Sequence, residues 1–117
     1  MEYKPCYSEV AGIITEASQH FGDIYLLQEE KFARMRDICA IIDKLVPELD
    51  AESLDVNVDE TSKRLNIGIE CDEVVLEYGR TSDFFKLIKM VDSFSFSKVE
   101  EDLMRVDFNI EGMWERD

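Results

Sequence analysis

The feature that most constrains this chain is a regular alternation of apolar and polar side chains between residues 53 and 112. A period of two places successive side chains on opposite faces of a β-strand, so each strand buries one face and leaves the other in water. The alternating segments are Leu54–Val58, Leu65–Cys71, Val74–Tyr78, Phe94–Phe96 and Met104–Ile110. Five such strands predict a mostly antiparallel sheet with helices on one face only.

Helical spacing occupies the first part of the chain. Apolar residues recur every three or four positions over residues 10–21 and again over residues 24–45. We expect Ser8 to cap the first series, and we expect Pro47 to end the second at or before Val46.

Gly22 and Asp23 stand between the two helical series. A helix that ran from Ser8 to Val46 without a break would be about 58 Å long. A domain of this length has a radius of gyration of about 13 Å. We therefore predict a break or kink at 20–23.

One more helix is expected between the third and fourth strands, where Thr81 or Ser82 can cap it and Asp83 suits its first turn. Its apolar stripe consists of Phe84, Leu87, Ile88 and Val91. The 117 residues thus predict one α+β domain of order α(α)-β-β-β-α-β-β. Residues 1–46 form its helical region, and residues 53–115 form its five-stranded sheet with the inserted helix.

The chain is strongly acidic, with 27 acidic and 13 basic residues and a formal net charge of −14. The acids are spread over both halves of the chain and do not form a tail. Such a negative field disfavours nucleic acid and anionic membranes as partners and favours basic proteins. The acids could equally serve solubility alone.

Three cysteines, Cys6, Cys39 and Cys71, indicate a reducing compartment, because an odd number at wide spacing does not suit a disulfide framework. The first residues lack a basic stretch followed by an apolar one, so we expect no signal peptide. No apolar run approaches the ~18 residues that a membrane span needs. We expect a cytoplasmic protein.

Motifs that carry chemistry are missing from the sequence. It has no glycine-rich phosphate loop and no GxSxG motif, and His20 is its only histidine, which excludes a two-histidine metal site. Asp55, Asn57 and Asp59 imitate the start of a calcium loop, but Glu60 replaces the required glycine and Asn66 the bidentate glutamate. We expect no cofactor, no metal and no catalytic residue.

A cysteine–histidine pair is a further catalytic option. It would need His20 beside one of the three thiols. We expect Cys39 and Cys71 to be buried and Cys6 to lie in a frayed N-terminus, so we do not favour this pair.

The polar face of the predicted sheet gathers acids and amides. Its members are Asp55, Asn57, Asp59, Asn66, Glu70, Glu77, Asp107, Asn109 and Glu111. Like charges side by side on a sheet are unfavourable unless they are paired or screened. This face is either a docking surface for a basic protein or a solvated face that Arg105 and Lys63 or Arg64 partly neutralise.

Two apolar sites are further candidates for protein binding. Phe85 and Met113 fall off the inward pattern of their elements, and with Val75 they could form an exposed apolar patch. Trp114 is the second candidate, because tryptophan is enriched at interfaces.

The order of elements, the size and the acidity over residues 30–112 resemble the type III secretion chaperones. The resemblance implies a homodimer that binds extended segments of other proteins. Members of that family often end in a further helix, which this chain lacks, and its N-terminal helical region is longer than theirs. No binding residue is transferred, because the sequence contains no motif of the family.

These observations predict a non-enzymatic protein-binding module, chaperone-like or adaptor-like, that forms a homodimer through the helix at 24–46 or the last strand. One alternative is a mimic of nucleic-acid charge that inhibits a basic protein, which requires a continuous stripe of acids. Another is a small enzyme that uses carboxylates, which requires a concave pocket with at least two acids.

Overall fold

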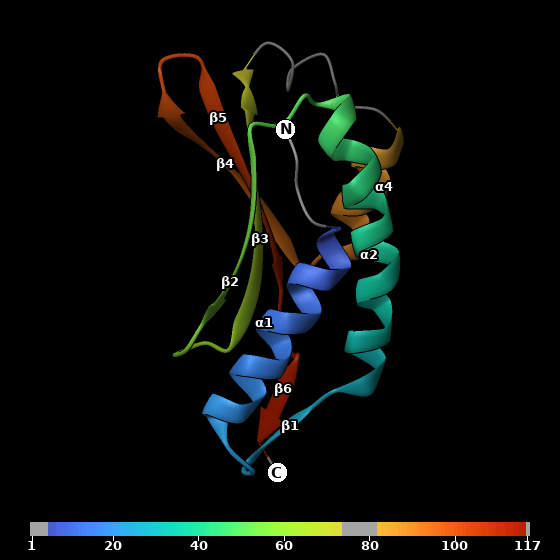
Figure 1. Ribbon diagram of the computed structural model, residues 1–117, viewed down its shortest axis with the longest axis vertical. Helices are drawn as coiled ribbons and strands as arrows, with labels where there is room; N and C mark the ends of the chain where they lie inside the picture. Colours follow the sequence, from blue (N-terminus) through green and yellow to red (C-terminus); the bar gives the residue numbers. More distant parts are fainter. Residues whose placement is uncertain (1–4, 74–81, 117) are drawn as a thin grey trace.

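The computed structural model describes residues 5–73 and 82–116. Along the chain its elements are α1 (Cys6–Phe21), β1 (Tyr25–Leu27), α2 (Glu29–Glu48), β2 (Ser53–Asp59), β3 (Arg64–Asp72), α4 (Ser82–Met90), β4 (Ser93–Glu100), β5 (Leu103–Ile110) and β6 (Trp114–Arg116). The helices lie on one side of a twisted sheet, as Figure 1 shows. The expected α+β class and the expected placement of the helices on one face are therefore confirmed.

The main sheet has four antiparallel strands in the order β2-β3-β5-β4. In its centre, Ile67 pairs with Phe108 and Ile69 with Val106. Four of the five predicted strands form this sheet, and β1 and β6, which the sequence did not predict as strands, make a separate two-stranded sheet. The strand expected over residues 74–78 lies outside the described residues.

The core lies between the main sheet and the helices. Its largest fully buried side chains are Ile14 of α1; Met35, Ile38, Ile42 and Leu45 of α2; Leu49, directly after α2; Leu65, Ile67 and Ile69 of β3; Phe84 and Leu87 of α4; and Phe108 of β5. Burying a side chain of this kind stabilises the fold by about 1.5–3 kcal/mol. The inward positions of β3 and β5 are those that the alternation predicted.

The predicted helix break is confirmed, since α1 ends at Phe21 and Gly22 follows with a φ of 80°. Glycine adopts this left-handed conformation without the steric cost that other residues meet. The predicted start of the second helix was wrong, however, because residues 25–27 form β1 and α2 begins at Glu29. Leu27 pairs with Trp114 of β6, and the Gln28 N–H donates to the Met113 carbonyl at 2.8 Å. This pairing across the fold overrides the local helical spacing.

Two predicted helix ends were also wrong. Ser8 lies inside α1, and its N–H donates to the carbonyl of Pro5, the residue before the helix, at 3.0 Å. Pro47 lies inside the last turn of α2, which continues to Glu48. The proline has no N–H to donate within the helix, and its carbonyl accepts a hydrogen bond from the Asp50 N–H at 3.2 Å.

The last residues turn away from the main sheet. Gly112, with a φ of 72°, separates β5 from β6, so Trp114 belongs to the small sheet and does not extend β5. Met113, which we expected on an exposed patch, is fully buried. The small sheet lies at the end of the molecule where α1 ends and α2 begins, and it contributes to the 45 Å long axis (Figure 1).

Candidate functional site

Among the described residues the main sheet has two edge strands, β2 and β4, and β4 is exposed along its whole length. All eight of its residues are exposed, and among the described residues only β5 pairs with it. Backbone N–H and C=O groups on the free side of such a strand are available to pair with another chain. Natural sheets often interrupt an exposed edge, and here a register shift lies between Lys98 and Glu100, so the regular part of the β4 edge is Ser93–Lys98.

A cluster of phenylalanines lies at this edge, and we call Phe84, Phe85, Phe94, Phe96 and Phe108 the phenylalanine cluster. The ring of Phe84 lies 6.1 Å from Phe85, 6.2 Å from Phe96 and 6.3 Å from Phe108, and Phe94 lies 5.9 Å from Phe96. Phe84 and Phe108 are buried, whereas Phe85, Phe94 and Phe96 are 50%, 41% and 37% exposed. Their rings thus continue the core out to the surface at the helix side of β4.

The alternation along β4 explains how both kinds of side chain reach the surface. Phe94 and Phe96 lie opposite Phe108 and Val106 of β5, on the face that the helices cover. At the edge of the sheet α4 covers these rings only in part. On the other face, Ser93, Ser95 and Ser97 lie opposite Asn109, Asp107 and Arg105.

The charge near the phenylalanine cluster differs from that of the chain as a whole. Residues 82–98 contain two acids, Asp83 and Asp92, and three bases, Lys86, Lys89 and Lys98, although the chain has 27 acids and 13 bases. The surface formed by α4 and β4 is therefore close to neutral on a molecule of net charge −14. A strongly acidic turn follows directly, with Glu100, Glu101 and Asp102 all exposed.

The polar face of the main sheet brings together four of the residues that we proposed for protein binding: Asp55, Asn57, Glu70 and Asp107. Its centre is Arg105, which donates two hydrogen bonds of 2.7 Å to Asp55 and one of 2.9 Å to Asp107. The Glu70 carboxylate lies 3.8 Å from the same guanidinium. The hydrogen bonds to Asp55, with help from Asp107, raise the pKa of Arg105 above its ordinary value, although burial opposes the shift.

Gly68 makes this arrangement possible. It lies between Asp55 and Asp107 in the register of the three strands. The Arg105 guanidinium crosses the sheet directly over Gly68, in the space that a Cβ at that position would occupy.

Amide side chains continue the network across the sheet. Asn66 donates to Asn109 at 2.9 Å and to Asp107 at 3.2 Å, and Asn109 donates to Ser93 at 3.3 Å. Throughout residues 5–73 and 82–116, every buried side-chain nitrogen and oxygen has a hydrogen-bond partner. The polar face is therefore largely satisfied by its own side chains.

The remaining predicted binding residues lie apart from this network. Asp59 accepts hydrogen bonds from the Thr61 and Ser62 N–H groups in the β2–β3 turn, at 2.8 and 3.1 Å. Glu111 is exposed just after β5, and its N–H donates to Asp92 at 2.7 Å. Glu77 lies outside the described residues, as does Val75.

Trp114 lies in the core and not at a surface. Its indole N–H donates to the Ser18 hydroxyl at 2.8 Å, and its ring meets the Phe21 ring edge-on at 5.2 Å. Phe85, in contrast, is exposed and belongs to the phenylalanine cluster. Sequence parity pointed to Phe85, but it did not show that Phe94 and Phe96 would be exposed as well.

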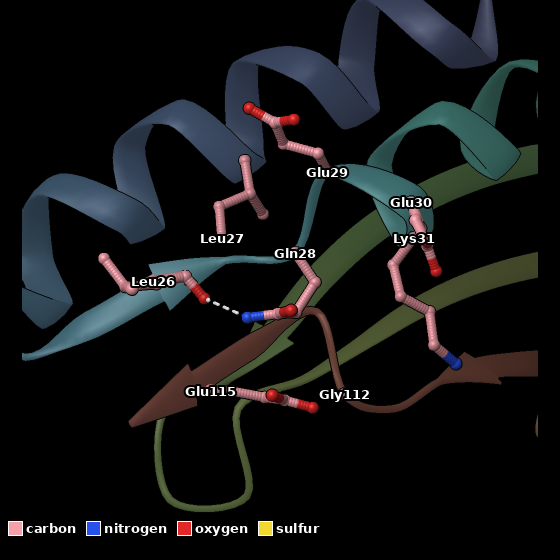
Figure 2. A pocket seen from close by; sticks show the side chains of 8 residues that line it. All are labelled: Leu26, Leu27, Gln28, Glu29, Glu30, Lys31, Gly112 and Glu115. Atoms are coloured by element: carbon pink, nitrogen blue, oxygen red, sulfur yellow. Dashed lines mark hydrogen bonds between the residues drawn. The ribbon is translucent and has the colours of Figure 1, made fainter. Parts of the chain in front are cut away.

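An open hollow of about 570 Å³ lies where β1 leads into α2, and Figure 2 shows the side chains around it. Three glutamates, Glu29, Glu30 and Glu115, contribute to its lining. Gln28 lies between Glu29 and Glu115 in this view, and it donates to the Leu26 carbonyl at 3.2 Å. The hollow meets the minimum condition for a carboxylate-based enzyme, which is a concave site lined by at least two acids.

His20, the single histidine, lies in the last turn of α1, with its Nε2 3.2 Å from Glu60. Cys6 is at the opposite end of the same helix, so these two residues form no catalytic pair. Cys6 itself is fully buried, contrary to our expectation of a frayed terminus, because α1 begins there and packs on α2.

No family model, curated protein or solved structure matches this chain. In the part of the chain that the structure describes, no helix is both long and apolar enough to cross a membrane. The fold and the site together define an α+β domain whose antiparallel sheet ends in an exposed, phenylalanine-bearing strand.

Proposed function

We propose that this protein is a non-enzymatic, chaperone-like or adaptor-like binding module that takes up an extended segment of another protein as an added strand along β4. The observation that carries the proposal is the full exposure of β4 together with Phe94 and Phe96. An exposed edge supplies backbone hydrogen bonds for affinity, and adjacent side-chain pockets supply specificity. This class of function is also the one that a likeness to secretion chaperones would imply.

The geometry of β4 sets the form of the segment. Eight residues in extended conformation span roughly 27 Å. Every second side chain of an added strand would lie on the helix side of the sheet, beside Phe94, Phe96 and Phe85. An apolar side chain at those positions would cover the exposed rings, which favours a segment with alternating apolar residues.

Charge complementarity determines the rest of the segment. The surface of α4 and β4 is nearly neutral, so it suits the apolar part. The acidic turn Glu100–Asp102 at the end of β4 favours basic residues at the adjoining end of the segment. The net charge of −14 also attracts a basic protein from solution.

A different protein suits this site better than a second copy of the same chain. Two copies would each carry a net charge of −14 over the whole chain, and this repulsion opposes their association although the surface of α4 and β4 itself is close to neutral. We therefore place the expected homodimer second to a basic partner. A location in the cytoplasm remains part of the proposal, since a binding module with three free cysteines suits a reducing compartment.

The polar face gives less support to docking, because its carboxylates already pair with Arg105. The same arginine interrupts the continuous acidic stripe that a mimic of nucleic-acid charge needs. For these reasons the β4 edge is a stronger candidate than the acidic face.

A displayed library of random twelve-residue peptides, selected on the purified chain, tests the proposal. Enriched peptides should alternate apolar residues and carry basic residues at one end. Their affinity, measured by fluorescence anisotropy, should fall about tenfold or more when Phe94 and Phe96 are both changed to serine, because each ring contributes buried apolar area.

The matched control changes Ile24 and Leu26, which are 57% and 49% exposed at the far end of the molecule, to serine. This double variant removes as much exposed apolar surface and should leave the peptide affinity unchanged. A third variant, Asp55→Asn, removes one carboxylate from the polar face. Equal losses in the two double variants, or a loss only in Asp55→Asn, would contradict a site at β4. A dimer in sedimentation that the Phe94→Ser/Phe96→Ser variant abolishes would show that the occupant is a second copy.

A further inference from the structure

Two buried thiols meet where α1 packs on α2. Cys6 is the first residue of α1, and Cys39 lies in the middle of α2, with exposed fractions of 0% and 1%. Their Sγ atoms are 3.2 Å apart, close enough for one thiol to donate a hydrogen bond to the other. A disulfide requires about 2.05 Å, so a movement of roughly 1.2 Å would join them.

Contacts around the pair hold the two helices in this register. The Cys6 N–H donates to the Asp43 carboxylate, one turn beyond Cys39, at 3.0 Å. Beside it, the Tyr7 ring lies 6.2 Å from Phe32, and the Arg36 guanidinium lies 5.2 Å from the centre of the Tyr7 ring. The first turn of α1 is therefore fixed to α2 from both sides of Cys6.

The third cysteine, Cys71, lies apart from this pair. Cys71 is buried on β3, at an inward position opposite Met104 of β5, and the chain has no fourth cysteine to pair with it. Burial alone would place all three cysteines in the core as small apolar residues. Burial does not require two of them to meet.

We propose that Cys6 and Cys39 are a site of reversible disulfide formation, and that the disulfide fastens α1 to α2. The oxidant is a low-molecular-weight disulfide such as oxidised glutathione. One cysteine thiolate attacks a sulfur of that disulfide, forming a mixed disulfide and releasing one thiol. The second cysteine thiolate then attacks the protein sulfur of the mixed disulfide, which forms the Cys6–Cys39 bond and releases a second thiol. Two protein thiols are oxidised, one small disulfide is reduced, and both thiol protons pass to the two released thiolates.

Reaction requires the first turn of α1 to open, because both sulfurs are buried. Helix ends open more easily than helix centres, and Cys6 is the first helical residue. The hydrogen bond to Cys39, burial, and the nearby carboxylates of Asp43 and Glu9 raise the pKa of Cys6 well above its usual range. In the closed structure the Cys6 thiol is therefore protonated and both sulfurs are buried, so slow oxidation is expected.

The disulfide would stabilise the fold. It would close a loop from residue 6 to residue 39 and so restrict the unfolded chain. For a domain of this size we expect the melting temperature to rise by about 5–15 °C. This disulfide could not be predicted from the sequence, because the odd number of cysteines and their wide spacing argue against any disulfide.

The test incubates the full-length reduced chain with oxidised glutathione and then alkylates the remaining thiols under denaturing conditions. Intact mass should show one alkylated cysteine per chain and no bound glutathione. Peptide mapping should find Cys6 joined to Cys39 and Cys71 alkylated. The melting temperature should rise on oxidation and return to its first value with dithiothreitol.

Cys71→Ser is the matched control and should behave as the wild type does in all these measurements. Cys6→Ser and Cys39→Ser should each lose the intramolecular bond and the reversible rise in melting temperature. If a serine variant does not fold, the comparison of the wild type with and without dithiothreitol still decides the matter. Cys6 and Cys39 that both remain alkylatable after prolonged oxidation, or that each carry glutathione, would overturn the proposal.

Discussion

The two exposed surfaces of the main sheet differ in whether their own side chains satisfy them. The polar face carries most of the sheet's charge, yet Arg105 joins its carboxylates and the asparagines bond to one another. The β4 edge carries little net charge, yet three phenylalanines and all residues of Ser93–Glu100 are exposed there. A surface is therefore judged better as a binding site by the apolar side chains and backbone groups that it leaves exposed than by its charge.

The comparison also explains why a highly acidic sheet is stable. Arg105, supported by the absence of a side chain at Gly68, hydrogen-bonds to two of the repelling carboxylates, Asp55 and Asp107, and forms a longer ion pair with Glu70. At β4 the described residues do not cover the apolar rings fully, and Phe85, Phe94 and Phe96 stay partly exposed to solvent.

The largest expected effect is a difference in the free energy of unfolding between alanine variants of two neighbouring phenylalanines. Phe84→Ala should lower the free energy of unfolding by about 3–5 kcal/mol, because its ring is buried among Phe85, Phe96 and Phe108. Phe85→Ala should change it by less than about 0.5 kcal/mol, because that ring is half exposed. Urea denaturation measures both, and equal losses would mean that Phe85 is a core residue and not part of a free surface.

Removing the cation from the polar face should have the next largest effect. Arg105→Ala should destabilise the fold by about 1–2 kcal/mol, because Asp55 and Asp107 lose their charge-assisted hydrogen bonds. Arg105→Lys should recover only part of this loss, since an ammonium lacks the planar two-pronged geometry of the guanidinium. An unchanged denaturation midpoint in Arg105→Ala would show that the face is solvated and not internally paired.

The need for glycine at position 68 depends on Arg105. The expected loss of stability is smaller here, but a double-mutant comparison tests the contact directly. Gly68→Ala should cost about 1 kcal/mol in the wild type, because its Cβ would displace the guanidinium. In an Arg105→Ala background the same change should be neutral or stabilising, since alanine suits a strand better than glycine. The same loss in both backgrounds would contradict the proposed position of Arg105.

The smallest effect concerns the rim of the polar face. Hydrogen bonds from the Ser62 and Thr61 N–H groups lower the pKa of the Asp59 carboxyl below its ordinary value. Because the folded pKa is the lower one, this group contributes stability above the ordinary pKa and loses it as the pH falls through the folded pKa. A carboxyl titration followed by NMR should give a midpoint for Asp59 below that of a free aspartate. A midpoint at or above that of a free aspartate would contradict the turn geometry.

Much of the fold could be predicted because local patterns determine it. The alternation over Leu65–Cys71 and Met104–Ile110 located β3 and β5, and Gly22 located the helix break. The pairing of β1 with β6 could not be predicted. The local spacing at Tyr25–Leu27 favours a helix, and these residues form a strand because they pair with residues 114–116, far away in the sequence.

The candidate site was harder to predict than the fold. Parity indicated which side chains share a face, and it correctly grouped Asp55, Glu70 and Asp107. It could not indicate that Phe94 and Phe96 would be exposed, because an inward position is buried only in a strand that helices fully cover. Nor could spacing alone bring Cys6 beside Cys39, which depends on how α1 packs on α2.

Residue-resolved amide hydrogen exchange along Ser93–Glu100, in the free chain and with a selected peptide bound, tests the central claim most directly. Alternate amides should bond to β5 and exchange slowly, while those between them should exchange rapidly in the free chain and become protected in the complex. Slow exchange at every β4 amide in the free chain, or rapid exchange at the outward amides in the complex, would contradict an open edge that binds an added strand.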